Sequence, residues 1–109
     1  PTLGWGKDFF DSQSMLDPIL NGKNIVPVGN ANYSQADDPK LNAAMDKVET
    51  LTDATARAKA WAAIDKEATA QAFYVPWLWD NQINFASKNV NGVKSEFNSS
   101  WDLTASSLK

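Results

Sequence analysis

Apolar residues recur along the chain at spacings that change from one segment to the next, and each spacing predicts an element. Between residues 38 and 72 they recur every three or four positions, which is the spacing of one helical face. Thr52–Asp53 interrupts the pattern, so we expect two consecutive helices. Asp38 followed by Pro39 favours the start of the first helix, because an acid can cap it and proline suits its first turn.

The apolar stripes of these two helices should pack against each other or on a common sheet. We interpret Trp61, the largest side chain in the second stripe, as a core anchor rather than a ligand contact. The stripes consist of Leu41, Ala44, Met45, Val48 and Leu51, and then of Ala54, Ala58, Trp61, Ile64, Ala68 and Ala72.

A shorter helix is expected closer to the N-terminus. Residues 15–20 place four apolar side chains on one helical face, and Ser12 or Ser14 can cap its start. Pro18 limits this helix to a turn or two, and Asn21–Gly22 supplies a residue that can end it.

Beyond Phe73 the pattern becomes typical of strands. Residues 74–79 are rich in β-favouring side chains, and residues 82–86 alternate between apolar and polar. With a turn at Asp80–Asn81 between them, these segments predict a hairpin.

Two further extended segments, residues 90–97 and 101–108, follow with a turn at residues 98–100. Helices in the first part of the chain and strands in the second predict an α+β fold.

Composition narrows the possible functions. The chain has 109 residues, of which 43% are hydrophobic and 21% charged, as in a globular domain with one modest core. The net charge is −3 and the ten basic residues are scattered, which argues against a nucleic-acid partner. No run is long and apolar enough to span a membrane, and no signal peptide is recognisable.

Cysteine and histidine are both absent. This excludes disulfides, thiolate metal sites and a Ser-His-Asp arrangement. We predict no metal site and no cofactor, and any enzyme would have to use carboxylates, lysines or hydroxyls.

The candidate chemistry begins in the N-terminal loop. Leu3 and Trp5 form an apolar lead-in broken by Gly4 and Gly6, which we interpret as the end of a strand that opens into a loop. The next acid is Asp8.

Asp8 is the first candidate binding residue. Trp5, Phe9 and Phe10 flank it, and an acid partly shielded by aromatic rings can hold a cation or a donor group strongly. The alternative is an ordinary helix cap or a solvated surface group.

Asn30 and Tyr33 are further candidates, in an irregular loop over residues 23–35. Their amide and phenol groups can hydrogen-bond a ligand, or the amides can simply close Asx-type turns.

Two other functions compete with ligand binding. Asp8 and Asp11 beside Trp5 could form a two-carboxylate glycosidase site, although Asp11 is more simply a helix cap. A structural or protein-interaction domain, with its tryptophans in the core, is the third hypothesis.

Several short motifs, in this order, resemble the C-terminal portion of solute-binding proteins of the oligopeptide/dipeptide-binding class (family 5), which serve bacterial ABC importers. The resemblance covers essentially the whole chain, and the motifs that carry it are Gly4-Trp5-Gly6-Lys7-Asp8-Phe9-Phe10-Asp11, Leu16-Asp17-Pro18, Gly29-Asn30, Asn32-Tyr33, Asp38-Pro39-Lys40-Leu41, Thr52-Asp53 with Arg57, Val75-Pro76 and Trp101-Asp102-Leu103.

The resemblance implies part of a two-lobed, hinge-closing fold of the type II periplasmic-binding-protein kind, with helices packed on a mixed sheet. Residues 1–87 would form most of a C-terminal lobe segment, and residues 88–109 would be strands returning toward the other lobe. Because the sequence opens with Pro1, inside the expected strand, we expect a piece of a longer receptor chain, with the remainder of that chain as a partner.

In peptide-binding members of this class, the acid of a Trp-x-x-Asp motif holds the α-amino group of the ligand, and Asp8 occupies the matching position. The resemblance thus implies a peptide-binding site with Asp8, Trp5, Phe9, Asn30 and Tyr33, and no catalysis. The usual Tyr and Asp-Pro pair after the acid are replaced here by Phe9-Phe10-Asp11-Ser12. Sugar-binding and metal-chelate-binding members exist, so an oligosaccharide is the alternative solute.

The same resemblance implies delivery of the solute to an ABC permease in the membrane. It also implies an extracytoplasmic location, in the periplasm or at the cell surface, with a lipid anchor on the full-length protein.

Overall fold

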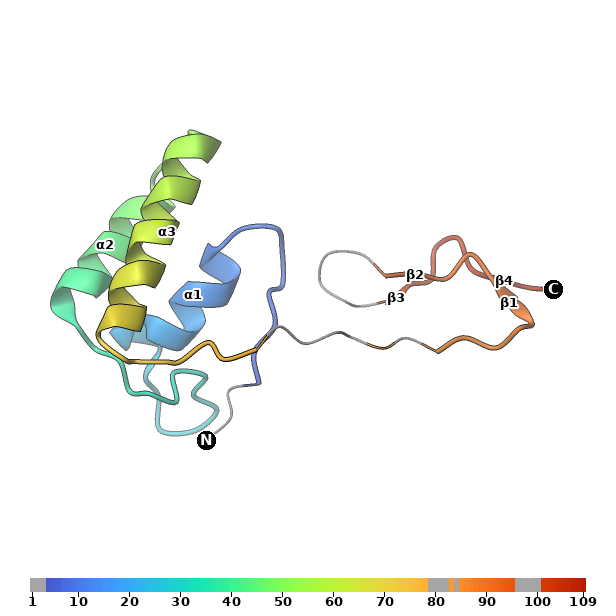
Figure 1. Cartoon of the computed structure of the whole chain (residues 1–109), viewed down its shortest axis with the longest axis horizontal. Helices are drawn as coiled ribbons and strands as arrows, with labels where there is room; N and C mark the ends of the chain where they lie inside the picture. The colour runs from blue at the N-terminus through green and yellow to red at the C-terminus, as the bar shows by residue number, and fades with distance from the viewer. Residues whose placement is uncertain (1–3, 79–82, 84, 96–100) are drawn as a thin grey trace. The chain divides into compact units, whose positions relative to one another are not determined.

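The computed structural model describes residues 4–78, 83, 85–95 and 101–109 (Figure 1). The chain divides into two compact units, Pro1–Pro76 and Trp77–Lys109.

The first unit is helical. It contains α1 (Gln13–Leu20), the short 3-10 helix η1 (Gly22–Asn24), α2 (Pro39–Glu49) and α3 (Ala54–Ala70). Helices α2 and α3 lie side by side and α1 contacts both of them (Figure 1). The three helices expected from the apolar spacing are therefore confirmed.

Acidic side chains begin the two longer helices, as predicted. The Asp38 carboxylate accepts hydrogen bonds from the backbone N–H groups of Lys40 (2.7 Å) and Leu41 (3.0 Å), and Pro39 lies in the first turn. The Asp53 carboxylate accepts from the N–H of Ala56 at 2.7 Å. These bonds satisfy N–H groups that have no partner within the helix.

The cap of α1 differs from the expectation. Ser12 is at the N-cap position, but its backbone has helical angles (φ −64°, ψ −23°) and its side chain makes no capping bond. A capping side chain normally needs an extended backbone to fold back onto the helix. Asp11 takes the role instead, because its Oδ1 accepts from the N–H of Gln13 at 2.8 Å.

One hydrophobic core lies within the helical unit. Trp61 lies at the centre of this core and is only 1% exposed, which confirms its predicted role as a core anchor. Ala54, Ala58 and Ala72 are exposed, so the buried stripe of α3 is narrower than the sequence predicted. The core consists of Leu16, Ile19, Leu20, Ala36, Leu41, Met45, Val48, Trp61, Ile64 and Ala68.

A buried amide holds the loop before α2. Asn32 is fully buried, its Nδ2 donates to the carbonyl of Ala36 at 2.8 Å, and its Oδ1 accepts from the N–H of Ala36 at 2.9 Å. The same Nδ2 also donates to the carbonyl of Asn21 (3.3 Å). Because both polar atoms of the buried Asn32 amide have partners, the irregular loop can pack on the core.

The described residues of the second unit contain four two-residue strands: β1 (Val90–Asn91), β2 (Lys94–Ser95), β3 (Trp101–Asp102) and β4 (Ser107–Leu108). Strand β1 pairs antiparallel with β4, and β2 pairs antiparallel with β3. The two extended segments expected here therefore pair with each other, over shorter lengths than predicted.

Gly92 separates β1 from β2 with a φ of +70°, and a side chain there would collide with the backbone of Ala105. Glycine is thus required at this break in the ladder.

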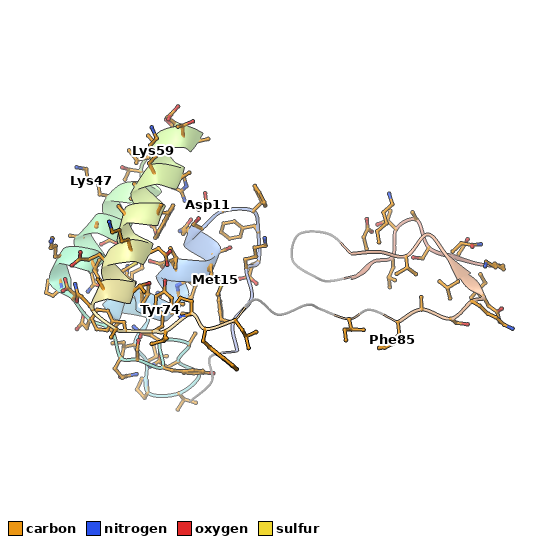
Figure 2. All side chains as sticks on the ribbon, viewed as in Figure 1. Asp11, Met15, Lys47, Lys59, Tyr74 and Phe85 are labelled. Atoms are coloured by element: carbon orange, nitrogen blue, oxygen red, sulfur yellow. The ribbon has the colours of Figure 1, made fainter. Side chains whose placement is uncertain are left out.

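Two strand predictions are wrong for the residues described. Residues 74–78, 83, 85 and 86 form no strand, while the proposed turn at Asp80–Asn81 lies outside the described residues. Phe73 and Tyr74 pack against the helical core instead, and the Tyr74 hydroxyl donates to Asp65 of α3 (Figure 2). Residues 4–7 also form no strand, and Leu3 is outside the described part.

The α+β composition is confirmed, but the expected mixed sheet is not found among the described residues, because both of their ladders are antiparallel. The described residues do not form the two lobes that the resemblance implies for the longer chain. The division of residues 1–87 and 88–109 between lobes stays a prediction.

Candidate functional site

The loop before α1 is held against the first turn of that helix. Trp5 is half-buried beside the core, and its Nε1 donates to the carbonyl of Ser14 at 2.9 Å. The Ser14 hydroxyl has two acceptors at 2.9 Å, the carbonyls of Phe9 and Asp11. The N–H of Asp11 donates to the carbonyl of Phe9 (2.8 Å), which closes a tight turn just after Asp8.

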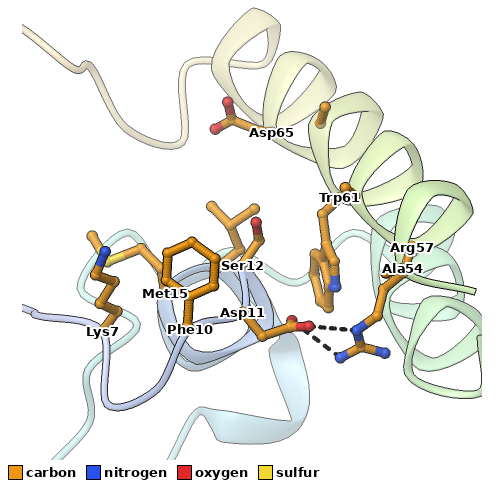
Figure 3. Close-up of a pocket in the computed structure, with 12 residues that line it drawn as sticks. Lys7, Phe10, Asp11, Ser12, Met15, Ala54, Arg57, Trp61 and Asp65 are labelled. Carbon is orange, nitrogen blue, oxygen red and sulfur yellow. Dashed lines mark hydrogen bonds and ion pairs between the residues drawn. The ribbon is translucent and has the colours of Figure 1, made fainter. Parts of the chain in front are cut away.

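An ion pair fastens this turn to α3. Arg57 Nε lies 2.6 Å from Asp11 Oδ2, and Arg57 Nη2 donates to Asp11 Oδ1 at 3.1 Å (Figure 3). The side chains are 16% and 26% exposed, respectively. The hydrogen bond from Arg57 lowers the pKa of the Asp11 carboxyl, and the same bond raises the pKa of the guanidinium.

Arg57 uses all five N–H groups of its guanidinium. Besides the two bonds to Asp11, Nη2 donates to Oε1 of Gln13 (3.0 Å), while Nη1 donates to the carbonyls of Val48 (2.8 Å) and Glu49 (3.3 Å). The last two carbonyls belong to the C-terminal turn of α2, where a cation is favoured. One side chain therefore joins the loop, α1, α2 and α3.

A hollow of about 660 Å³ opens beside this ion pair (Figure 3). Three of its charged side chains are engaged: Asp11 and Arg57 bind each other, and Asp65 accepts from the Tyr74 hydroxyl. Chemically, the hollow suits an apolar group. Its lining is Lys7, Phe10, Asp11, Ser12, Met15, Leu16, Ala54, Arg57, Ala58, Trp61, Ala62 and Asp65.

Asp8 does not line this hollow. It is exposed, and its carboxylate forms no hydrogen bond or ion pair with any residue that the structure describes. The expected aromatic shielding is wrong here, because Phe9 is 48% exposed and Phe10 is 82% exposed. Asp8 itself is exposed, so these neighbouring rings leave its carboxylate open. Contact between Asp8 and a ligand stays a prediction.

Asn30 and Tyr33 lie in the loop before α2. The Oδ1 of Asn30 accepts from the N–H of Asn32 at 2.7 Å, which is the Asx-type turn that the sequence offered as one alternative. Tyr33 is exposed. Across the described ranges, no hydrogen bond joins either residue to residues 5–9, so their roles as ligand contacts also stay predictions.

A second charged cluster links η1 to α2 and was not predicted. Lys23 Nζ lies 3.2 Å from carboxylate oxygens of Asp17 and Asp46 and 3.4 Å from one of Glu49. Partial burial alone would lower the pKa of Lys23, but its bonds to Asp17 and Asp46 outweigh burial and raise the pKa to about 12. Local spacing gives no sign of the full cluster, because Asp46 and Glu49 are 23 and 26 residues from Lys23 in sequence.

Neither a metal centre nor a membrane span is visible in the described part of the chain. Its acidic side chains form no group of three that could hold a metal ion. None of its helices combines the length and the apolar character needed to cross a bilayer.

No protein-family model matches the chain, and no curated protein matches it. A solved structure named "Clavulanic acid biosynthesis oligopeptide binding protein 2" is similar to it, with a TM-score of 0.85 and 31% sequence identity. The similarity covers 95% of this chain and 19% of that protein, so the chain spans about a fifth of its length. Over that segment, the expected resemblance to an oligopeptide-binding protein is supported.

Proposed function

We propose that this chain is part of the solute-binding component of an ABC importer, and that the intact receptor closes two lobes around a small peptide. The observation that carries the proposal is the similarity to an oligopeptide binding protein over 95% of the chain. The motifs around Asp8 support the same assignment, because they resemble those of peptide-binding receptors.

Asp8 is the proposed contact for the α-amino group of the peptide. Its carboxylate is exposed and has no polar partner among the described residues, so it is open to an ammonium group. Lobe closure would remove water from such a pair and strengthen it. Trp5, Phe9, Asn30 and Tyr33 would complete the binding surface.

Binding without bond cleavage is the proposed chemistry. A glycosidase would need one carboxyl with a raised pKa to act as its acid. The hydrogen bond from Arg57 instead lowers the pKa of Asp11. Both of its oxygens are also occupied by Arg57 and Gln13.

The receptor is proposed to work outside the cytoplasm, held by a lipid anchor, and to deliver its solute to a membrane permease. Purification of the full-length protein, followed by mass spectrometry of the small molecules released on denaturation, tests the solute class. Peptides are expected. Oligosaccharides would favour the alternative receptor, and turnover of an oligosaccharide would favour the glycosidase.

The role of Asp8 has its own test. Asp8→Asn in the full-length protein should weaken binding of a peptide with a free α-amino group by about 2 to 5 kcal/mol, since the ammonium loses its charged partner. Calorimetry measures the change. Glu67→Gln on α3 removes the same charge outside the loop and is the control. Unchanged affinity of the Asp8 variant for every peptide bound would exclude Asp8 from the site.

A further inference from the structure

We propose that Asp11 and Arg57 form a positioning clamp, which holds the turn after Asp8 so that the Asp8 carboxylate stays presented to the ligand. This inference rests on the proposed function of Asp8. Among the described residues, no hydrogen bond or ion pair restrains the Asp8 side chain itself. Its location therefore depends on the backbone that follows it.

The clamp is short and directional. Two parallel N–H groups of Arg57 bind the two carboxylate oxygens of Asp11, at 2.6 and 3.1 Å. Such a two-point contact fixes the orientation of the carboxylate as well as its distance. Both side chains are partly buried, so salt screens this pair less than it screens a fully exposed one.

Hydrogen bonds connect the clamp to the carbonyl of Phe9, the residue that follows Asp8. The N–H of Asp11 and the hydroxyl of Ser14 both donate to the carbonyl of Phe9, at 2.8 and 2.9 Å. Phe9 directly follows Asp8. The Phe9 carbonyl belongs to the peptide group between Phe9 and Phe10, one residue beyond Asp8. Holding Asp11 therefore helps to hold that peptide group, and releasing Asp11 leaves Ser14 as its remaining support.

The other end of the clamp is anchored on the two helices that carry the centre of the core, α2 and α3. Arg57 donates to the carbonyls of Val48 and Glu49 at the end of α2, and it lies one helical turn before the buried Trp61. The loop thus takes its position from the α2–α3 pair.

The test separates a positioning role from a merely stabilising one. Arg57→Lys keeps the charge but replaces a planar, five-donor group with a single ammonium. Asp11→Asn keeps an acceptor for the Gln13 N–H and removes the charge. Lys59→Arg is the matched control, since this exposed α3 residue has no polar partner among the described residues (Figure 2).

Each full-length variant is offered a pool of tripeptides with free α-amino groups and the same pool after N-acetylation. Bound peptides are quantified by mass spectrometry, and melting temperature is recorded separately. The readout is the preference for free over acetylated peptide, which a loss of stability alone does not change in the folded fraction.

We expect the wild-type protein and Lys59→Arg to prefer free peptides by at least about 30-fold. This is the smallest loss of affinity that normally follows when one partner of a buried charge pair is removed. Both clamp variants should reduce the preference by about tenfold, because a displaced carboxylate makes a weaker pair. The double variant Asp8→Asn with Arg57→Lys should show nearly the same preference as Asp8→Asn alone, because both changes act on the same contact.

The outcomes distinguish the two proposals. A wild-type protein without a preference for free α-amino groups overturns the proposed role of Asp8, and the clamp inference falls with it. A wild-type preference that either folded clamp variant retains in full overturns the clamp inference alone. If Arg57→Lys does not fold, Asp11→Asn decides between these outcomes.

Discussion

The Asp11–Arg57 pair shows what a partly buried ion pair needs at the scale of single residues. Removing charges from water costs free energy, and the attraction between them offsets that cost only when their other polar groups also find partners. Here Gln13 and the end of α2 occupy the remaining N–H groups of Arg57, while the N–H of Gln13 binds Asp11. The pair is therefore well satisfied on both sides.

This pair should make stability depend on acid. Because the folded state lowers the pKa of Asp11, its contribution is present above the unfolded pKa of about 3.9 and is lost as pH falls through the lower folded pKa. We expect Asp11→Asn to lower the melting temperature of the full-length protein at pH 7. The difference from wild type should shrink below about pH 4.

Thermal melts of both proteins, without ligand, from pH 7 to pH 2 measure this effect. Lys59→Arg, which leaves the pair intact, should follow the wild-type curve. If the difference in melting temperature between Asp11→Asn and wild type stays constant from pH 7 to pH 2, the loss of stability does not come from ionisation of Asp11.

The sequence predicted one of the two roles of Asp11, the helix cap, but not its ion pair with Arg57. Its role as a cap follows from local spacing and is confirmed by the bond from Gln13. Its pairing with Arg57, 46 residues away, depends on how α1 packs against α3, and no local pattern contains that information. The exposure of Asp8 fits the solvated surface group that the sequence left open as an alternative. The expected shielding is wrong because aromatic residues that neighbour an acid in sequence need not cover it in space.

At the scale of elements, helices were predictable and strands were much less so. Asp38, Pro39 and Asp53 act within one turn of the helices they begin, so their effect can be read locally. A strand depends on a partner that only the tertiary fold supplies. Tyr74 shows the consequence, because a segment with strand-like composition packs against α3 instead.

Trp61 gives the element-scale prediction, because it anchors α3 in the core. Trp61→Ala should lower the free energy of unfolding by about 3 to 5 kcal/mol through lost burial and a cavity. Trp61→Phe should cost clearly less, about 1 to 2 kcal/mol, since a ring remains. The indole Nε1 is buried without a hydrogen-bond partner among the described residues, so phenylalanine sacrifices no bond.

Denaturant unfolding of the full-length protein, followed by circular dichroism, compares the two variants. Ala63→Ser, at an exposed position of the same helix, is the control and should change stability by less than about 0.5 kcal/mol. Equal losses for both Trp61 variants would show that the indole N–H does find a partner.

At the scale of the whole molecule, the chain presents more large apolar side chains to solvent than one helical core can cover. Many of them follow the helical unit in sequence, and Phe10 belongs to the loop that carries Asp8. In the proposed receptor, the other four fifths of the length would be available to cover these side chains, as the comparison covering 19% of a longer protein suggests. Examples are Phe10, Val28, Val75, Trp77, Ile83 and Phe85.

The 109-residue chain expressed by itself should therefore self-associate. Exposed apolar surface drives association, and the short ladders in residues 90–108 leave strand edges that can pair with a second copy. Analytical ultracentrifugation over a range of concentrations should detect dimers or larger species, while the full-length receptor under the same conditions stays monomeric. A monomeric fragment that unfolds in one cooperative transition would show that these side chains need no cover, and would remove this support for a larger receptor.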